Sequence, residues 1–211
     1  MQSSKLKSIA KPVRDFSRDV KNRLKIPSSI LSAKRQGNII KRMEGLELLL
    51  DNAKAKNVLD IGCYDGLIAY EFARRGANTV LGLDNDQYHL NTAKRIFSQM
   101  EMDSKFVHVD LRNDDLGELV NGTSDKNKEF GIVLFLGVFQ HIHSNMSEEE
   151  KQKLVDDICS SCKGFLAVRM PDHTWPAFDK YFWKEGFELI CNQDQIDTVG
   201  ALRLYKVVSH D

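Results

Sequence analysis

The sequence predicts an α/β fold: a doubly wound, mostly parallel sheet of seven strands, preceded by an N-terminal helical extension. Short apolar runs of strand length alternate with segments of helical periodicity, a pattern typical of parallel sheets wrapped by helices. Three of these runs end in an acid, namely Asp60, Asp84 and Asp110. A short loop with glycines at positions 62 and 66 joins the first run to the first helical segment. Because parallel strands place their carboxyl ends at one edge of the sheet, the loop and the acids indicate a binding site at that edge.

Strands and helices are expected to alternate from residue 57 onward. Strands are expected at 57–61, 79–83, 105–109, 132–136 and 164–169, with a closing pair at 187–191 and 202–208. Helices are expected at 66–75, 86–100, near 114–120, at 148–159 and at 175–184. Gly76 suits the end of the first helix, and Ser147 with Glu150 predicts a capping box at the start of the fourth. Loops are expected at 121–128 and, as a hairpin, at 193–200.

Residues 1–35 are expected to form a basic arm ahead of one domain over 36–211. Residues 1–43 carry 12 Lys or Arg against two Asp, so this part has a charge of +10 and the remainder −10. Between Pro12 and Pro27, apolar residues spaced by three and four predict an amphipathic helix. Such a basic helix suits an anionic membrane surface or RNA phosphates; alternatively, it packs on the acidic domain of its own or a neighbouring subunit. A second helix is expected from Ile39 to Leu50.

The composition fits a protein of a reducing compartment. No apolar run approaches the ~20 residues of a membrane span, and the N-terminus lacks the apolar block of a secretory signal. We therefore expect a cytoplasmic protein, with possible peripheral membrane contact through the basic arm. Cys159 and Cys162 have C-x-x-C spacing, but no second pair lies at zinc-finger distance. We expect no metal site and expect both cysteines to pack as small, partly buried side chains.

The glycine loop separates two classes of nucleotide ligand. A dinucleotide site requires G-x-G-x-x-G, but Tyr64 and Leu67 occupy the second and third glycine positions. The segment Val58 to Gly66, which reads VLDIGCYDG, instead resembles motif I of the class I S-adenosylmethionine-dependent methyltransferases. The later segments follow the order of elements in that Rossmann-like family. Many of its members have glycine where this chain has Tyr64, and a tyrosine is expected to fit there with a negative φ.

The resemblance implies a role for each residue around the loop. Gly62 and Gly66 are expected to line the methionine half of the cofactor, and Asp60 to orient the loop or meet the amino group through water. Asp84 is expected to bind the ribose hydroxyls, and Asp110 the adenine amino group. The full set of residues expected at the cofactor is Asp60, Gly62, Cys63, Tyr64, Gly66, Asp84, Asn85, Asp110 and Leu111. The expected product is S-adenosylhomocysteine.

Acceptor chemistry is expected after the fourth strand. The segment 137–143 occupies the position where many small-molecule methyltransferases carry histidines, and His141 is the first candidate for a general base, His143 the second. The alternative is that both histidines only shape the pocket. Arg169, His173 and Trp175 follow the fifth strand and are expected to bind the acceptor, with the guanidinium suited to a phosphate or carboxylate.

The sequence thus predicts an S-adenosylmethionine-dependent methyltransferase that acts on oxygen or nitrogen of a small-molecule or glycan-like acceptor. Neither an Asp-Pro-Pro-Tyr motif nor a Pro-Cys dipeptide is present in the fourth-strand segment, so methylation of DNA bases is not expected. One alternative is an RNA methyltransferase that uses the basic arm. Another is a non-catalytic binding subunit that retains the fold, because Gly131 stands where related strands often begin with Asp.

Overall fold

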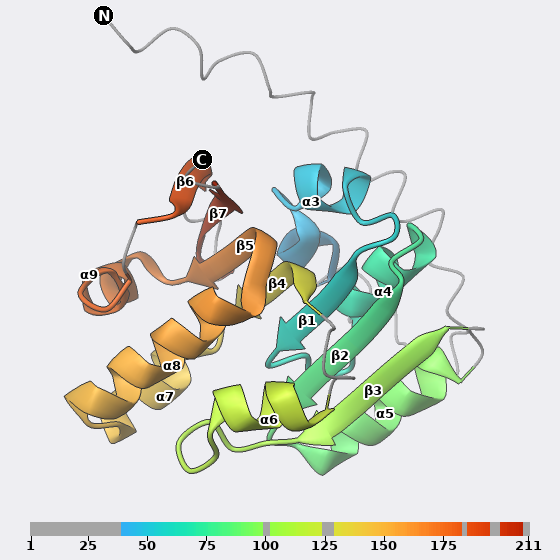
Figure 1. The fold of residues 1–211 in the computed structure, drawn as a ribbon, viewed down its shortest axis with the longest axis horizontal. Coiled ribbons are helices and arrows are strands. Elements are labelled where there is room, and N and C mark those ends of the chain that lie inside the picture. The colour runs from blue at the N-terminus through green and yellow to red at the C-terminus, as the bar shows by residue number, and fades with distance from the viewer. Residues whose placement is uncertain (1–38, 99–101, 124–128, 183–184, 195–198, 209–211) are drawn as a thin grey trace, which may run out of the picture.

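The computed structural model describes residues 39–98, 102–123, 129–182, 185–194 and 199–208. The basic arm and its expected amphipathic helix lie outside the described residues. The described part forms a seven-stranded sheet in the order β3-β2-β1-β4-β5-β7-β6 (Figure 1). Strands β1 to β5 pair in parallel, whereas β7 runs antiparallel to both β5 and β6. The predicted α/β class with a mostly parallel, seven-stranded sheet is confirmed.

The strands lie where the alternation of apolar runs placed them. Their bounds are β1 Asn57–Ile61, β2 Thr79–Asp84, β3 Asp103–His108, β4 Phe130–Leu136, β5 Cys162–Met170, β6 Phe187–Gln193 and β7 Ala201–Val207. The central strands β1, β2 and β4 are buried along nearly their whole length, as expected for strands covered on both faces. The edge strand β3 is largely exposed.

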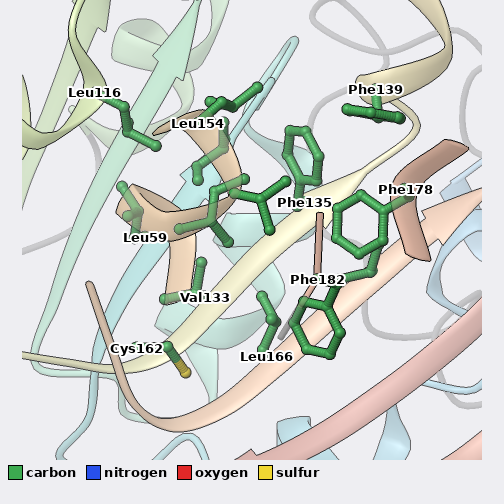
Figure 2. Packing of buried hydrophobic residues seen from close by; sticks show 14 of the residues in the cluster. Leu59, Leu116, Val133, Phe135, Phe139, Leu154, Cys162, Leu166, Phe178 and Phe182 are labelled. Carbon is green, nitrogen blue, oxygen red and sulfur yellow. The ribbon is translucent and has the colours of Figure 1, made fainter. Parts of the chain in front are cut away.

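Helices cover both faces of the sheet. Their bounds are α3 Glu47–Asp51, α4 Leu67–Arg74, α5 Gln87–Phe97, α6 Leu116–Thr123, α7 Phe139–Ile142, α8 Glu148–Ser161 and α9 Trp175–Asp179, with 3-10 turns η2 at His143–Asn145 and η3 at Asp172–Thr174. One hydrophobic core includes side chains from α3, α4 and α5, and a second includes side chains from α6, α8 and α9. Figure 2 shows Phe135, Phe139 and Phe178 meeting in the second core.

Several boundaries differ from the sequence-based expectation, among them those of three helices. The expected helix over 39–50 is broken: residues 39–43 are helical, Gly45 has φ +86°, and α3 begins at Glu47. Helix α9 ends at Asp179 instead of 184, and α6 includes Asn121 to Thr123, which were expected in a loop. The capping box of α8 is confirmed, since Ser147 and the side chain of Glu150 each accept from the other's main-chain N–H. No helix in the described ranges is long and apolar enough to cross a membrane.

Candidate cofactor and acceptor sites

Asp60 is a buried carboxylic acid at the carboxyl end of the central strand β1. It is 3% exposed, and its Oδ2 has no hydrogen-bond partner among the described residues. Burial raises the pKa of Asp60 to about 7, and the negative charge of Asp84 adds to this effect. A buried oxygen without a partner is costly unless a ligand or water satisfies it. Asp60 is therefore suited to meet a positively charged or hydrogen-bonding group above the loop.

The glycines of the loop allow close packing of neighbouring elements. Gly62 has φ +77°, and a Cβ there would lie 2.2 Å from Cγ2 of Val138, just after β4. Gly66 has φ +70°, and a Cβ there would lie 2.8 Å from Cβ of Ala93 on α5. The N–H groups of Gly62 and Cys63 both donate to the carbonyl of Leu83. The loop is thus held tightly between β2, α5 and the β4 end, with its backbone at the sheet edge.

Tyr64 adopts a backbone conformation that the sequence-based expectation did not foresee. Its φ is +53°, so the expectation of a negative φ was wrong. The residue is 41% exposed, and its ring lies against the ring of His89 on α5, with the two centroids 3.5 Å apart and the ring planes tilted by 31°. The structure therefore places the tyrosine ring against α5.

Asp84 is held at the tip of β2 by two main-chain donors. Its Oδ2 accepts from the N–H of Tyr64 at 2.7 Å, and its Oδ1 accepts from the N–H of Asp86 at 2.9 Å. The residue is partly exposed, so each carboxylate oxygen keeps accepting capacity for a ligand. Asn85 is exposed beside it, and its carbonyl oxygen lies 3.0 Å from Nε2 of His108.

Asp110 follows β3, close to the same edge, but its carboxylate is already engaged. It accepts from Nε and Nη2 of Arg112 at 2.8 and 2.7 Å and from Nδ2 of Asn113 at 3.0 Å. The pKa of Asp110 is lowered to about 2, mainly by the hydrogen bonds from Arg112. Its neighbour Leu111 is partly buried. An adenine amino group at Asp110 would have to share these oxygens with the guanidinium.

The two candidate histidines lie after β4 in different environments. His141 is exposed, and its Nε2 lies 3.4 Å from Nε2 of Gln140. The His143 ring stacks on Phe139, and its Nδ1 lies 2.9 Å from the carbonyl oxygen of Phe139. Because a carbonyl oxygen can only accept, Nδ1 of His143 carries the proton, and Nε2 is left with the lone pair in the neutral ring.

Arg169 is buried and does not face solvent. It is 4% exposed, and its guanidinium donates to the carbonyls of Arg42 and Glu44 in the N-terminal segment. Burial lowers the pKa of Arg169 to about 10. The sequence-based expectation was that this guanidinium binds an acceptor phosphate or carboxylate, whereas in the structure both terminal nitrogens donate to main-chain oxygens.

The other two residues expected at the acceptor differ in how far they are exposed. His173 is exposed in η3, whereas Trp175 is 4% exposed and packs edge-on against Phe178. The guanidinium carbon of Arg203 lies 3.8 Å from the centroid of the Trp175 ring. The indole Nε1 of Trp175 has no hydrogen-bond partner among the described residues, so it remains able to donate.

Sequence reasoning missed the pair formed by Asp65 and His89. The two side chains meet at 2.7 Å between Oδ1 and Nδ1, although they are 24 residues apart. The only signal in the sequence was a histidine in the first turn of the helix that follows Asp84. Elsewhere, no group of three or more His, Cys, Asp or Glu side chains within the described ranges could hold a metal ion. Cys159 and Cys162 are partly buried and buried, respectively, and burial raises their pKa values to about 12 and about 11.

Comparison with known proteins identifies the family. Residues 58–163 match the family model described as a methyltransferase domain. A ubiquinone biosynthesis O-methyltransferase from Bartonella quintana is 28% identical over 122 residues, which are 57% of this chain and 43% of that protein. The O-antigen chain terminator bifunctional methyltransferase/kinase WbdD from Escherichia coli is 28% identical over 122 residues, 56% of this chain and 16% of WbdD. The chain therefore spans less than half the length of either curated relative.

A solved structure supports the same fold. The TehB-like S-adenosylmethionine-dependent methyltransferase from Corynebacterium glutamicum superposes with a TM-score of 0.54 at 17% identity and covers 82% of this chain and 97% of its own. The family match covers half of the chain, and the observed sheet order places its glycine loop and acids at one edge. The chain belongs to the family of methyltransferase domains, in agreement with the sequence-based resemblance to the class I S-adenosylmethionine-dependent methyltransferases.

Proposed function

We propose that the chain binds S-adenosylmethionine at the carboxyl edge of β1 and β2. The single observation that carries this proposal is the buried Oδ2 of Asp60, which has no hydrogen-bond partner in the described part of the chain and lies at the strand end beside the glycine loop. Asp60 would meet the ammonium of the cofactor, directly or through water, and Asp84 would accept from the ribose hydroxyls. The residues proposed around them are Gly62, Cys63, Tyr64, Gly66 and Asn85, with Asp110 and Leu111 on the adenine side.

We propose a hydroxyl oxygen of a small-molecule or glycan-like compound as the methyl acceptor. The support comes from the relatives, which are named as O-methyltransferases of ubiquinone biosynthesis and as a chain terminator of O-antigen. When bound, the cofactor supplies an electrophilic methyl group on its sulfonium. The protein's task is then to align the acceptor oxygen for in-line attack and to remove its proton.

Two histidines of the segment after β4 are proposed to take part in that proton removal. His141 is exposed and remains the first candidate for the base. His143 is the second, because its Nδ1 donates to Phe139 and its Nε2 is free to accept a proton. His173 and Trp175, after β5, are proposed to contact the acceptor, the latter through its unpartnered indole N–H.

The basic charge of residues 1–27 supports a further part of the proposal, a docking role for the arm at an anionic membrane surface. RNA phosphates are the alternative partner, and in that case the acceptor would be an RNA base or ribose. The arm would then bring residues 36–211, the proposed catalytic domain, close to a membrane-associated or polyanionic acceptor.

Binding and acceptor identity are tested separately. Calorimetry with S-adenosylhomocysteine tests the cofactor site, with NAD as the control ligand of the other nucleotide class. Transfer of a labelled methyl group is then measured on phenols, glycans, amines and RNA. Methylation of phenols or glycans supports the proposal, whereas exclusive methylation of amines or RNA overturns the proposed acceptor. Failure to bind S-adenosylhomocysteine overturns the proposed site.

A further inference from the structure

Asp65 and His89 form a nearly buried pair directly against Tyr64. The His89 Nδ1 lies 2.7 Å from Oδ1 of Asp65, and the two side chains are 13% and 1% exposed. The Tyr64 ring lies against the same imidazole in a tilted arrangement, with a centroid distance of 3.5 Å and an interplanar angle of 31°. The contacts therefore run from a buried carboxylate through an imidazole to the tyrosine of the glycine loop.

The contact with His89 accompanies an unfavourable backbone conformation of Tyr64. Tyr64 has φ +53°, a region in which the Cβ of an L-residue crowds the following carbonyl, while glycine adopts it freely. Residues other than glycine persist in such a conformation only when surrounding contacts hold them there. The centroid of the Tyr64 ring lies 3.5 Å from that of His89 and 5.8 Å from the guanidinium carbon of Arg42.

The backbone of Tyr64 in turn orients the proposed ribose acid. Its N–H donates to Oδ2 of Asp84 at 2.7 Å, and the second oxygen of Asp84 accepts from Asp86 at 2.9 Å. If Tyr64 turned to a negative φ, its N–H would point in another direction and this bond would be lost. Only the carboxylate oxygen of Asp84 that accepts from Asp86 would then be held by a main-chain hydrogen bond.

We infer that His89, held in place by Asp65, is a positioning residue for cofactor binding: it keeps Tyr64 in the left-handed conformation, which orients Asp84. The inference rests on the proposed function, in which Asp84 binds the ribose. It predicts that His89 contributes to cofactor affinity only because residue 64 carries a side chain. With glycine at that position, the backbone reaches the same conformation without help.

The test is a double-mutant cycle with S-adenosylhomocysteine affinity as the readout. The His89→Gln variant keeps an N–H donor for Asp65 but removes the aromatic ring. In the otherwise wild-type chain, it should weaken binding by roughly tenfold, because the ligand must then restore the loop conformation. In the Tyr64→Gly background, the same substitution should change the affinity by less than about twofold. Lys94→Ala is the control, since Lys94 is an exposed residue of the same helix α5.

The outcomes separate this inference from the proposed function. If the wild-type chain does not bind S-adenosylhomocysteine, both the proposed site and this inference are wrong. Binding by the wild type together with an equal loss from His89→Gln in both backgrounds overturns the inference alone, because His89 would then act independently of residue 64. An unchanged affinity in the single His89→Gln variant also overturns it. Thermal unfolding of each variant confirms that affinities are compared between folded proteins.

Discussion

The guanidinium of Arg169, near the end of β5, donates to the main-chain carbonyl of Arg42, which lies 127 residues earlier in the chain. A second nitrogen of the same guanidinium donates to the carbonyl of Glu44. These carbonyls lie where the helical residues 39–43 end, so they lack partners within a helix. Arg169 thus fastens the N-terminal segment to the sheet.

Replacing Arg169 should mainly lower the stability of the fold, and its effect on acceptor binding should be smaller. Arg169→Met should lower the free energy of unfolding by about 3 kcal/mol, because two main-chain carbonyls lose charged donors. Urea unfolding measures this loss. Arg203→Met is the control, since Arg203 is 22% exposed and bonds Asp179, and its loss should cost about 1 kcal/mol. An unchanged stability with a raised KM for an anionic acceptor would restore the acceptor role.

Asp84→Ala should weaken binding of S-adenosylhomocysteine by roughly tenfold to a hundredfold. Two ribose hydroxyls would lose a charged acceptor, which typically costs about 1.5 to 3 kcal/mol. Calorimetry on the folded variant measures the change, and Glu188→Ala, an exposed acid on β6, serves as the control. Equal affinities of wild type and Asp84→Ala would contradict the ribose assignment.

Asp60 should make the stability of the ligand-free protein fall as the pH rises. Its pKa is raised from the usual 3.8 to about 7, so between these values the folded protein holds a proton that the unfolded chain has released. This favours the folded state at low pH, and the effect is lost as the pH rises through about 7. At about 1.4 kcal/mol per pH unit, the contribution of Asp60 to the free energy of unfolding reaches about 4 kcal/mol. Chemical unfolding across this range should show the dependence in wild type and its loss in Asp60→Asn.

The same carboxyl should make cofactor affinity depend on pH in the opposite direction. A ligand ammonium near Asp60 favours the ionised carboxylate, so affinity for S-adenosylhomocysteine should increase from about pH 6 to about pH 8. Calorimetry at each pH measures it. A wild-type profile as flat as that of Asp60→Asn would show that the ammonium lies elsewhere.

His141→Ala should lower kcat by roughly 10² on a hydroxyl acceptor while leaving cofactor affinity little changed. The physical reason is that removal of the acceptor proton is needed only during transfer. His143→Ala is the comparison, because His143 is fixed by its bond to Phe139. If only His143→Ala slows turnover, the base is His143; if neither does, both histidines are structural.

Salt dependence should reveal the role of the basic arm. If residues 1–27 dock on an anionic membrane, the full chain should float with anionic vesicles at low salt, and this association should fall steeply as salt is raised. Neutral vesicles are the control. Binding to RNA in a parallel filter assay, without flotation, would favour the RNA alternative.

The features predictable from the sequence are those fixed by local pattern. The buried run Ile132 to Leu136 and the capping box at Ser147 depend on neighbours within a few residues, and both were predicted correctly. The Tyr64 ring lies against His89, which belongs to another element, and the Arg169 guanidinium bonds a segment more than a hundred residues away. Such long-range contacts leave no periodic signal in one sequence, so neither of them could be predicted from it.

The insertion of β7 between β5 and β6 determines when the sheet can be completed during synthesis. Strand β6 pairs only with β7 in the described sheet, and β7 is made after it. The five parallel strands can therefore assemble while β6 still lacks a partner. Only when residues 201–207 have emerged from the ribosome can β7 dock on β5 and bring β6 with it. A nascent chain stalled before that point presents the edge of β5 as an unpaired strand, which makes it vulnerable to aggregation.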